Sequence, residues 1–207
     1  MFTGITEDIG KIFKIKKSGD RFFYIFTKIN YKSLKIGSSI SCNGICLTII
    51  KRGKKKKTNW FAITASKETL SKSNLGLMKS GSLINLETSL RVGDEISGHL
   101  VFGHIDTKTK LISKKYVGSS MILKIKLPFK LRSFITPKGS ITINGVSLTI
   151  NNVSSNSFKV NIIPHTLKST TFNQVDKNEL LNLEIDMLAR YVSNYVNINK
   201  LWNYSQK

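Results

Sequence analysis

An internal repeat constrains the fold of this 207-residue chain more than any other feature. The segment SISCNGICLTII (39–50) returns as GSITINGVSLTI (139–150), with Ile40 aligned to Ile141 at an offset of 101. FAITASKETL matches FKVNIIPHTL at an offset of 97, two NLE triplets (85–87 and 182–184) match at the same offset, and TGITEDIGKI resembles FGHIDTKTKLI at an offset of 99. Blocks in one order at a nearly constant offset indicate a tandem duplication. We therefore expect two related domains, residues 1–97 and 98–186.

Each half reads as a series of short strands. Segments rich in Ile, Val, Phe, Tyr and Thr are separated by Gly, Asn and Ser, as in RFFYIFTKI, WFAITAS and SSMILKIKL. Five or six strands in about 90 residues, without a helix long enough to cover a sheet, predict a small closed barrel, since closure removes exposed sheet edges. KETLSKSN and HTLKSTTF are expected to form short helices or turns. The repeated Asn-Gly favours a tight turn or bulge with positive φ.

The last segment, residues 187–207, has no counterpart in the first half. Apolar residues recur there at spacings of three and four, which predicts an amphipathic helix: Leu188, Tyr191, Val192, Tyr195, Ile198, Leu201 and Trp202. Asp186 can cap this helix. The apolar stripe must be buried against a barrel or against copies of itself, and its large aromatic residues favour self-association.

The composition excludes several classes of protein. The chain carries 33 Lys and Arg against 12 Asp and Glu, a net charge of +21. Only five of the basic residues are Arg, and Ile and Asn are abundant, so we interpret the charge as compositional bias and expect no specific nucleic-acid partner. The aromatics of RFFYIF alternate as core residues do, whereas a nucleic-acid-binding barrel would interleave aromatic and basic residues on one face. No apolar run or leader predicts a membrane span or secretion.

The two cysteines predict neither a disulfide nor a metal site. If Cys42 and Cys46 lie on one extended strand, they are about 13 Å apart, too far for a disulfide bond. A zinc site needs more ligands than C-x3-C and three scattered histidines provide. A reducing cytoplasm fits this cysteine usage.

The repeats also bring polar groups together in equivalent places. These groups are the paired side chains Cys46 and Ser147, Thr48 and Thr149, and Thr69 and Thr166, with the backbone of Gly4 and Gly103. Hydroxyls and main-chain amides of this kind can bind a flat polar heterocycle, so we expect one ligand site per half. GHLVFGHID, at the junction, contains His99 and His104. Each alone would be taken as structural, but both together beside Asp106 raise the expectation of an acid–base role.

Six blocks in register resemble the riboflavin synthase alpha-chain family over nearly the whole chain: MFTGI, NGICLT, GHLVFGHID, GSITINGVSLT, IPHTL and NLEIDMLARYV. The resemblance implies an all-β fold of two tandem six-stranded Greek-key barrels related by a pseudo-twofold, plus a C-terminal helix that joins three chains. It implies dismutation of two 6,7-dimethyl-8-ribityllumazine molecules without metal or organic cofactor, in active sites between subunits. The alternative is a non-catalytic antenna protein that binds lumazine or flavin. Both repeats keep their Asn-Gly and Leu-Thr, which favours the enzyme.

The resemblance also implies the residues around two pteridine rings. One ring would be surrounded by Gly4, Ile5, Thr6, Ser147, Leu148, Thr149, Asn161, Ile162, Ile163, Pro164, His165 and Thr166. The other would be surrounded by Cys46, Leu47, Thr48, Thr64, Ala65, Ser66, Lys67, Glu68, Thr69, Gly103, His104, Ile105 and Lys138. Ser147 and Cys46 are expected near C7 of the substrates. His104 and Thr149 would assist proton transfer or orientation, and Asp186 is either a partner of Ser147 or a helix cap.

Overall fold

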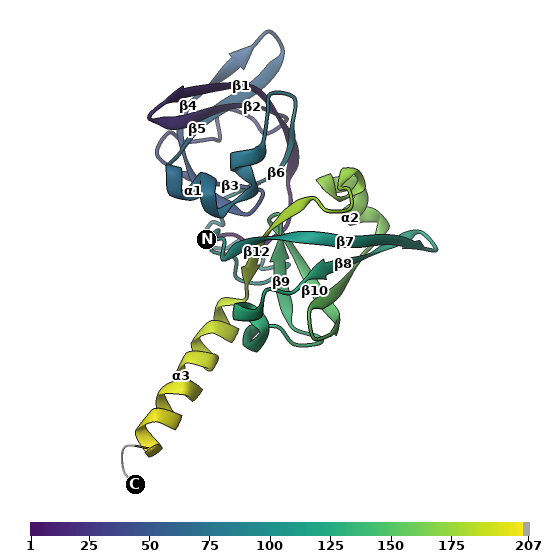
Figure 1. Ribbon diagram of the computed structural model, residues 1–207. Helices are drawn as coiled ribbons and strands as arrows, with labels where there is room; N and C mark the ends of the chain where they lie inside the picture. The colour runs from purple at the N-terminus through teal and green to yellow at the C-terminus, as the bar shows by residue number, and fades with distance from the viewer. Residues whose placement is uncertain (205–207) are drawn as a thin grey trace.

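Two closed antiparallel barrels of six strands each make up most of the protein (Figure 1). The computed structural model describes the backbone of residues 1–204 and the side chains of residues 1–196. The first barrel contains β1 (Asp8–Ser18), β2 (Asp20–Thr27), β3 (Ser39–Cys42), β4 (Ile45–Lys55), β5 (Thr58–Ala65) and β6 (Leu83–Thr88). The second contains β7 (Thr107–Val117), β8 (Ser120–Lys126), β9 (Ser140–Ile143), β10 (Val146–Val153), β11 (Ser157–Ile162) and β12 (Leu180–Ile185). The two-barrel prediction is confirmed, while the domain boundaries at 97/98 and 186/187 stay a prediction.

The two barrels have the same topology. The strands follow the order β1-β2-β5-β4-β3-β6 around the first ring and β7-β8-β11-β10-β9-β12 around the second. Each ring encloses its own apolar core, with Phe23 and Phe61 buried in the first and Phe158 and Phe172 in the second. Fully burying one such side chain stabilises the fold by roughly 1.5–3 kcal/mol. Because side chains alternate between the two faces of a strand, the apolar residues at every second position determine which face points into the core.

Short helical segments occupy equivalent places in the two halves. α1 (Lys67–Lys72) and η1 (Asn74–Leu77) follow β5, and α2 (Pro164–Ser169) and η3 (Thr171–Gln174) follow β11, as the sequence predicts. One further segment, η2 (Phe129–Phe134), connects β8 to β9 and has no counterpart of its kind in the first barrel. The repeat thus extends from the strands to the connections that flank the candidate site.

The repeated Asn-Gly corners are the tips of two hairpins, β3–β4 and β9–β10. Asn43 and Gly44 have φ of 49° and 81°, and Asn144 and Gly145 have 47° and 81°, which confirms the tight turn with positive φ. The two tips touch, because a Cβ on Gly44 would lie 2.8 Å from the backbone nitrogen of Gly145. The corners therefore form the contact between the barrels, a role that the sequence did not predict.

The hairpin also corrects the expected placement of the cysteines. Cys42 ends β3 and Cys46 lies on β4, so they are not on one strand. Cys42 points into the core and Cys46 is half-buried on the outer face, and both are free thiols. Burial, reinforced by Cys46, raises the pKa of the Cys42 thiol and keeps it protonated.

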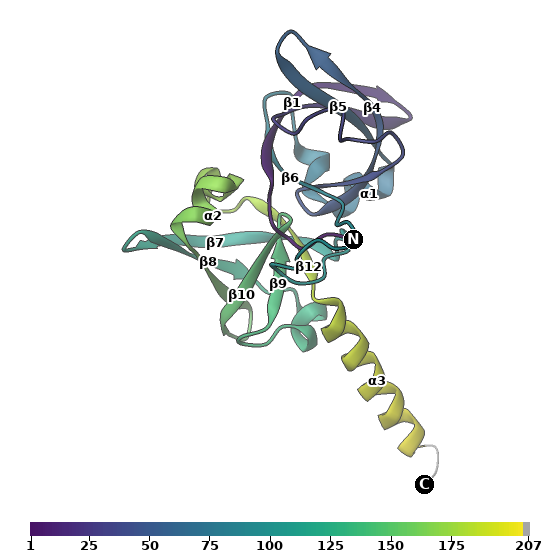
Figure 2. The ribbon, with the colours of Figure 1, turned by 180° about the vertical axis from the view of Figure 1, so that it is seen from behind.

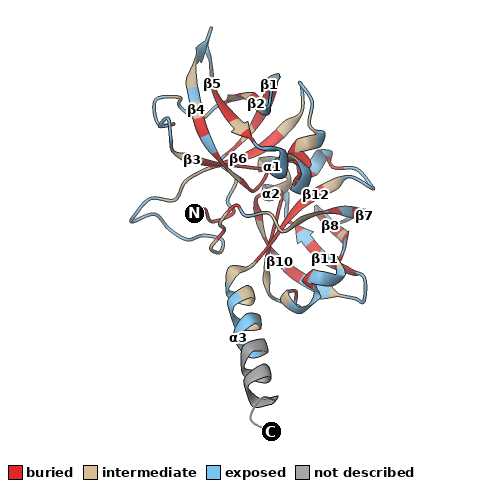
Figure 3. Ribbon diagram, turned by 60° about the vertical axis from the view of Figure 1, so that its left-hand side comes forward, coloured by how far each residue is buried: buried red, intermediate tan, exposed pale blue. Residues whose placement is uncertain are grey.

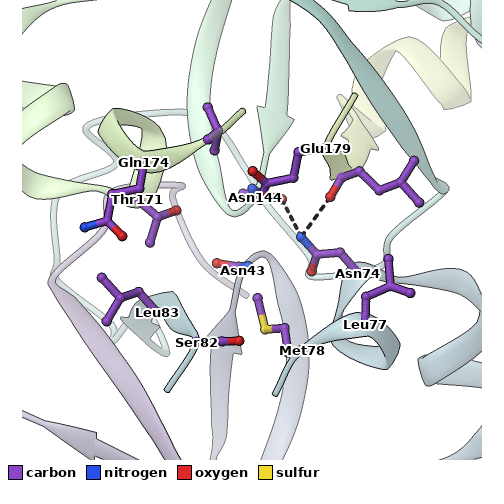
Figure 4. A pocket seen from close by; sticks show the side chains of 12 residues that line it. Asn43, Asn74, Leu77, Met78, Ser82, Leu83, Asn144, Thr171, Gln174 and Glu179 are labelled. Atoms are coloured by element: carbon purple, nitrogen blue, oxygen red, sulfur yellow. Dashed lines mark hydrogen bonds between the residues drawn. The ribbon is translucent and has the colours of Figure 1, made fainter. Parts of the chain in front are cut away.

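Buried asparagines join the two barrels around the hairpin tips. The Asn85 amide donates to the carbonyl oxygen of Asn144 (2.9 Å), and the Asn182 amide donates to that of Asn43 (2.9 Å). Asn74 donates through Nδ2 to Asn144 Oδ1 (3.1 Å), as Figure 4 shows. These bonds cross the interface between barrels, so they fix the angle at which the barrels meet. A groove of about 330 Å³ opens beside them, and none of its lining residues belongs to the predicted site.

Helix α3 (Met187–Tyr204) extends away from both barrels (Figures 1 and 2). Arg190 anchors it through an ion pair with Asp106, 2.6 Å between Nη2 and Oδ1, and Asp106 Oδ2 also accepts from the Ile185 amide (2.9 Å). The apolar stripe is exposed on the described part of the helix (Figure 3), with Tyr191 and Tyr195 exposed by 66% and 68%. The stripe residues Ile198, Leu201 and Trp202 lie outside the described side chains.

Only one of the four aromatics of RFFYIF, Phe23, is a core residue. Phe23 and Ile25 point inward, whereas Phe22, Tyr24 and Phe26 alternate to the outer face. There Phe26 stacks on Phe13 with ring centroids 3.9 Å apart. The expectation that these aromatics are core residues is therefore wrong for every second position of β2.

Candidate functional site

Two short segments cross between the barrels and build equivalent clusters. The first arm (residues 2–6) precedes β1, and the second arm (residues 101–105) precedes β7. The arms pair with each other, since Phe2 and Val101 exchange two backbone hydrogen bonds of 2.7 and 3.0 Å. Each arm then lies on a strand of the opposite barrel, so that both halves contribute to both clusters.

The contact between each arm and the opposite barrel is made through a glycine. The Ser147 amide on β10 donates to the Gly4 carbonyl (2.8 Å), and the Cys46 amide on β4 donates to the Gly103 carbonyl (3.0 Å). Both glycines have φ of +77°, and an added Cβ would lie within 2.7 Å of Ser147 or Cys46 atoms. No other residue fits this approach, because a side chain would be strained and would collide with the backbone opposite.

Two buried glutamates hold the arms in place. Glu87 on β6 accepts from the amides of Thr3 (2.7 Å) and Gly4 (3.1 Å). Glu184 on β12 accepts from the amides of Phe102 (2.8 Å) and Gly103 (3.0 Å). Sequence reasoning missed both residues as functional candidates, although they end the repeated NLE triplets. Repetition of a charged residue within an otherwise buried strand is the signal that points to them.

Burial raises the pKa of both glutamates, and that of Glu184 rises from an ordinary 4.5 to about 7. Hydrogen bonds from the arm amides oppose this rise. Because the folded protein binds the Glu184 proton more tightly than the unfolded chain does, this contribution to stability is fully present below pH 4.5. It is lost as the pH rises through about 7.

We expect Glu184→Gln to flatten the pH dependence of stability. The wild-type free energy of unfolding should fall between pH 5 and 8 by up to about 3 kcal/mol, at about 1.36 kcal/mol per pKa unit. Gln keeps an acceptor oxygen but has no proton to lose, so E184Q should lose clearly less. Urea unfolding at both pH values measures this, with exposed Glu95→Gln as the control. Parallel losses in E184Q and wild type would contradict the expectation.

The outer faces of β4 and β10 carry the predicted nucleophile-sized groups. Cys46 and Ser147 are half-buried, and Thr48 and Thr149 are exposed two residues further along the same faces. The neighbouring strands β5 and β11 add Thr64 and Asn161. The structure therefore gathers one predicted set of residues around β4 and the other around β10, each on the outer surface of its barrel.

The remaining predicted residues surround these two centres. Ile5 and Thr6 lie on the first arm and His104 and Ile105 on the second, with Ile105 packed against the first core. The other predicted residues lie at the starts of the short helices. The start of α1 carries Ser66, Lys67, Glu68 and Thr69, and the start of α2 carries Ile163, Pro164, His165 and Thr166. The side chains of four predicted residues are buried in the cores, and only their backbone can face a ligand: Leu47, Ala65, Leu148 and Ile162.

Lys138 and Asp186 lie apart from the two clusters or take a different contact within this chain. Lys138, which the resemblance places around the first-barrel ring, lies on the second barrel of this chain, where its amide donates to the Ile150 carbonyl (2.7 Å). Asp186 accepts from the Leu188 amide (2.9 Å), which makes it a cap of α3 rather than a hydrogen-bonded partner of Ser147.

The partner of Ser147 is His99, from the segment between the barrels. Its Nδ1 lies 2.6 Å from Ser147 Oγ, and its Nε2 lies 3.1 Å from Thr142 Oγ1. Burial lowers the pKa of His99, while the charge of Asp186 opposes this effect, so the imidazole is neutral near pH 7. Asp106, which the sequence suggested as a partner of the histidines, instead binds Arg190. His104 is exposed and lies near the Phe102 ring.

Neither a metal centre nor a membrane helix is found in the part of the chain that the structure describes. Within it, His, Cys, Asp and Glu side chains do not converge in groups of three. None of its helices has the length and apolarity needed to cross a membrane. The Thr6 hydroxyl is the one buried side-chain polar atom without a hydrogen-bond partner in residues 1–196.

Known proteins resemble this chain over nearly its whole length. Residues 3–89 and 102–186 each match the lumazine binding domain. The riboflavin synthase of Brucella abortus (strain 2308) is 38% identical over 97% of this chain and 100% of the relative. That of Photobacterium phosphoreum is 36% identical over 97% and 91%, and that of Buchnera aphidicola subsp. Schizaphis graminum is 37% identical over 93% and 92%.

Solved structures show the same fold. LumP complexed with riboflavin superimposes with a TM-score of 0.79 at 24% identity, covering 89% of this chain and 99% of LumP. LumP complexed with 6,7-dimethyl-8-(1'-D-ribityl) lumazine gives 0.77 at 22% identity, with the same coverage. The doubled domain match and the full-length relatives show that the chain belongs to the riboflavin synthase family of lumazine-binding proteins.

Proposed function

We propose that this chain is a transferase that dismutates two molecules of 6,7-dimethyl-8-ribityllumazine. One molecule gives a four-carbon unit to the other, and the products are riboflavin and 5-amino-6-(ribitylamino)uracil. The observation that supports this most is the pair of equivalent clusters, each with a Thr, a Cys or Ser, and a glycine arm from the other half. Two like substrates require two like sites, and the duplication supplies them.

The chemistry suits these residues. The C7 methyl of the lumazine is acidic, because its ring delocalises the carbanion, so a modest base suffices. Holding two substrates face to face can lower a bimolecular barrier by roughly 7–11 kcal/mol at best. The clusters differ where a donor and an acceptor must differ: Ser147 is paired with His99, whereas Cys46 has no histidine hydrogen bond among the described residues.

The antenna alternative has less support. The relatives that match at 36–38% identity over nearly the whole chain are riboflavin synthases, whereas the LumP structures match at 22–24%. Both clusters keep the Thr, the Cys or Ser and the glycine arm, so the degraded second site expected of a non-catalytic binder is not seen in residues 1–196.

Turnover of the lumazine tests the proposal. Purified protein with 6,7-dimethyl-8-ribityllumazine and no added cofactor should produce riboflavin, detected by fluorescence and chromatography. One riboflavin should form for every two lumazines consumed, because the second lumazine leaves as the uracil product. Tight binding of the lumazine without any riboflavin formation would overturn the proposal that the chain is an enzyme and would favour the antenna protein.

We further propose a cytoplasmic homotrimer with active sites between subunits. The exposed stripe of Leu188, Tyr191, Val192 and Tyr195 supports self-association, since a contiguous apolar face on a helix calls for a partner. If Lys138 serves the first-barrel ring as the resemblance implies, a neighbouring chain would supply it from its second barrel. The two unbridged cysteines support a reducing compartment.

Truncation tests the role of the helix. A chain that ends before Tyr191 keeps the Asp106–Arg190 ion pair but loses the stripe, so we expect monomers with intact barrels by sedimentation and circular dichroism. Tyr195→Asp should weaken the trimer in the full chain, whereas Asn194→Asp on another face of the helix should not. A trimer that survives the truncation would refute this role.

A further inference from the structure

Ser147, His99 and Thr142 form a hydrogen-bonded chain with a buried end. Thr142 on β9 lies directly opposite Ser147 on β10, so both side chains point to the same outer face. His99 lies between them and contacts Ser147 Oγ through Nδ1 (2.6 Å) and Thr142 Oγ1 through Nε2 (3.1 Å). Thr142 is 1% exposed, whereas Ser147 is half-buried and faces the candidate ligand site.

The burial of Thr142 decides the direction of these bonds. Its hydroxyl has one proton to donate, and His99 Nε2 is its one hydrogen-bond partner in the described part of the chain. If Nε2 carried the imidazole proton, the Thr142 proton would be left without an acceptor, at a cost of about 1–3 kcal/mol. If Thr142 donates to Nε2, the imidazole proton is on Nδ1 and is donated to Ser147 Oγ. Every buried proton then has a partner.

The direction also determines what Ser147 can do. When Ser147 Oγ accepts from His99, its own hydroxyl proton is free to be donated toward the ligand. The pteridine ring offers carbonyl oxygens and ring nitrogens as acceptors. In the opposite direction, Ser147 would donate to His99 and would be set up as a nucleophile with a general base.

We propose that Thr142 is a positioning residue that holds His99 as its Nδ1–H tautomer, so that Ser147 serves the bound pteridine as a hydrogen-bond donor. This role rests on the proposed function. The first barrel provides the comparison: Ser41 is the buried residue opposite Cys46, and no histidine bonds to it in residues 1–196. The chain of bonds is thus specific to the second barrel.

Nitrogen NMR of ¹⁵N-histidine-labelled protein tests the tautomer directly. The chain has three histidines, so His104 and His165 can be assigned by replacing each in turn. At pH 7.5 we expect His99 to show a pyrrole-type Nδ1 and a pyridine-type Nε2. A pyridine-type Nδ1 in the wild-type protein, or an imidazolium, would overturn the proposal. This readout needs no turnover, so it stands apart from the test of the proposed function.

Variants of Thr142 test its part in the arrangement. Thr142→Val keeps the shape but removes the donor, so it should shift His99 toward the Nε2–H tautomer and lower kcat about 10- to 100-fold with little change in KM. Thr142→Ser keeps the donor and should restore the tautomer and most of kcat. Ser41→Ala, the matched loss of a buried hydroxyl in the first barrel, should leave both unchanged. An unaltered tautomer in T142V would overturn the role of Thr142. If T142V does not fold, failure of T142S to retain the Nδ1–H tautomer would do the same.

Discussion

Gly103→Ala is expected to destabilise the protein by about 3 kcal/mol and to abolish ligand binding at the first-barrel cluster. The added Cβ would lie 2.6 Å from Cys46 Cβ and 2.7 Å from the Cys46 nitrogen, at a backbone φ of +77°. The arm must therefore move away from β4, which breaks the hydrogen bond from Cys46 to the Gly103 carbonyl. Gly4→Ala should act in the same way on Ser147.

Gly118→Ala separates the collision from the backbone strain. Gly118 also has a positive φ, of 58°, but nothing lies within 4 Å of its added Cβ. Its substitution should cost only about 1 kcal/mol. Urea unfolding of both variants, together with lumazine titration, measures the difference. If G103A were no less stable than G118A, the arm would not be held against β4 as the structure indicates.

Ser147→Ala should lower kcat by about 100-fold or more while changing the free energy of unfolding by less than about 1 kcal/mol. Ser147 is half-buried, and its backbone amide, which binds the Gly4 carbonyl, is unchanged by the substitution. What is lost is the hydroxyl that contacts His99 and faces the ligand. Steady-state riboflavin formation and urea unfolding give the two numbers.

Two further variants serve as the control and the comparison for S147A. Ser154→Ala removes an exposed hydroxyl from the β10–β11 turn and should change neither quantity. Cys46→Ala tests the other cluster and should also lower turnover far more than stability. Equal losses of activity and stability in S147A and C46A would mean that both residues serve the barrels rather than the reaction.

The parts of the fold that repeat or alternate could be predicted from the sequence. The offset blocks predicted two barrels, Asn-Gly predicted both tight turns, and three- and four-residue spacing predicted the C-terminal helix. These signals can be read from the order of residues alone, because each is a pattern within a short segment or the recurrence of such a segment. The alternation in RFFYIF correctly indicates a strand with two faces. It does not show that the outer face is polar, and Phe22, Tyr24 and Phe26 lie on that face.

The contacts that assemble the site could not be predicted in the same way. Glu87 and Glu184 accept hydrogen bonds from backbone amides that lie more than 80 residues away in the chain. Because every residue except proline has such an amide, the side chain of the partner does not indicate the bond. The 48-residue separation of His99 from Ser147 carries no signal in the sequence, whereas Asp106 lies close to both histidines along the chain. The bonds of Asn85 and Asn182 between the barrels were hidden for the same reason.

The crossing of the arms means that neither half of the chain encodes a complete cluster. A cut between residues 97 and 98 would leave the first barrel with Cys46 but without Gly103, its partner in the second arm. Two copies of residues 1–97 could satisfy each other, however, if the Gly4 arm of each copy lay on β4 of the other. The tandem chain thus contains, within one covalent molecule, the arm exchange of a symmetric dimer. Because its two halves are encoded separately, its two sites can differ, as they do at Cys46 and Ser147.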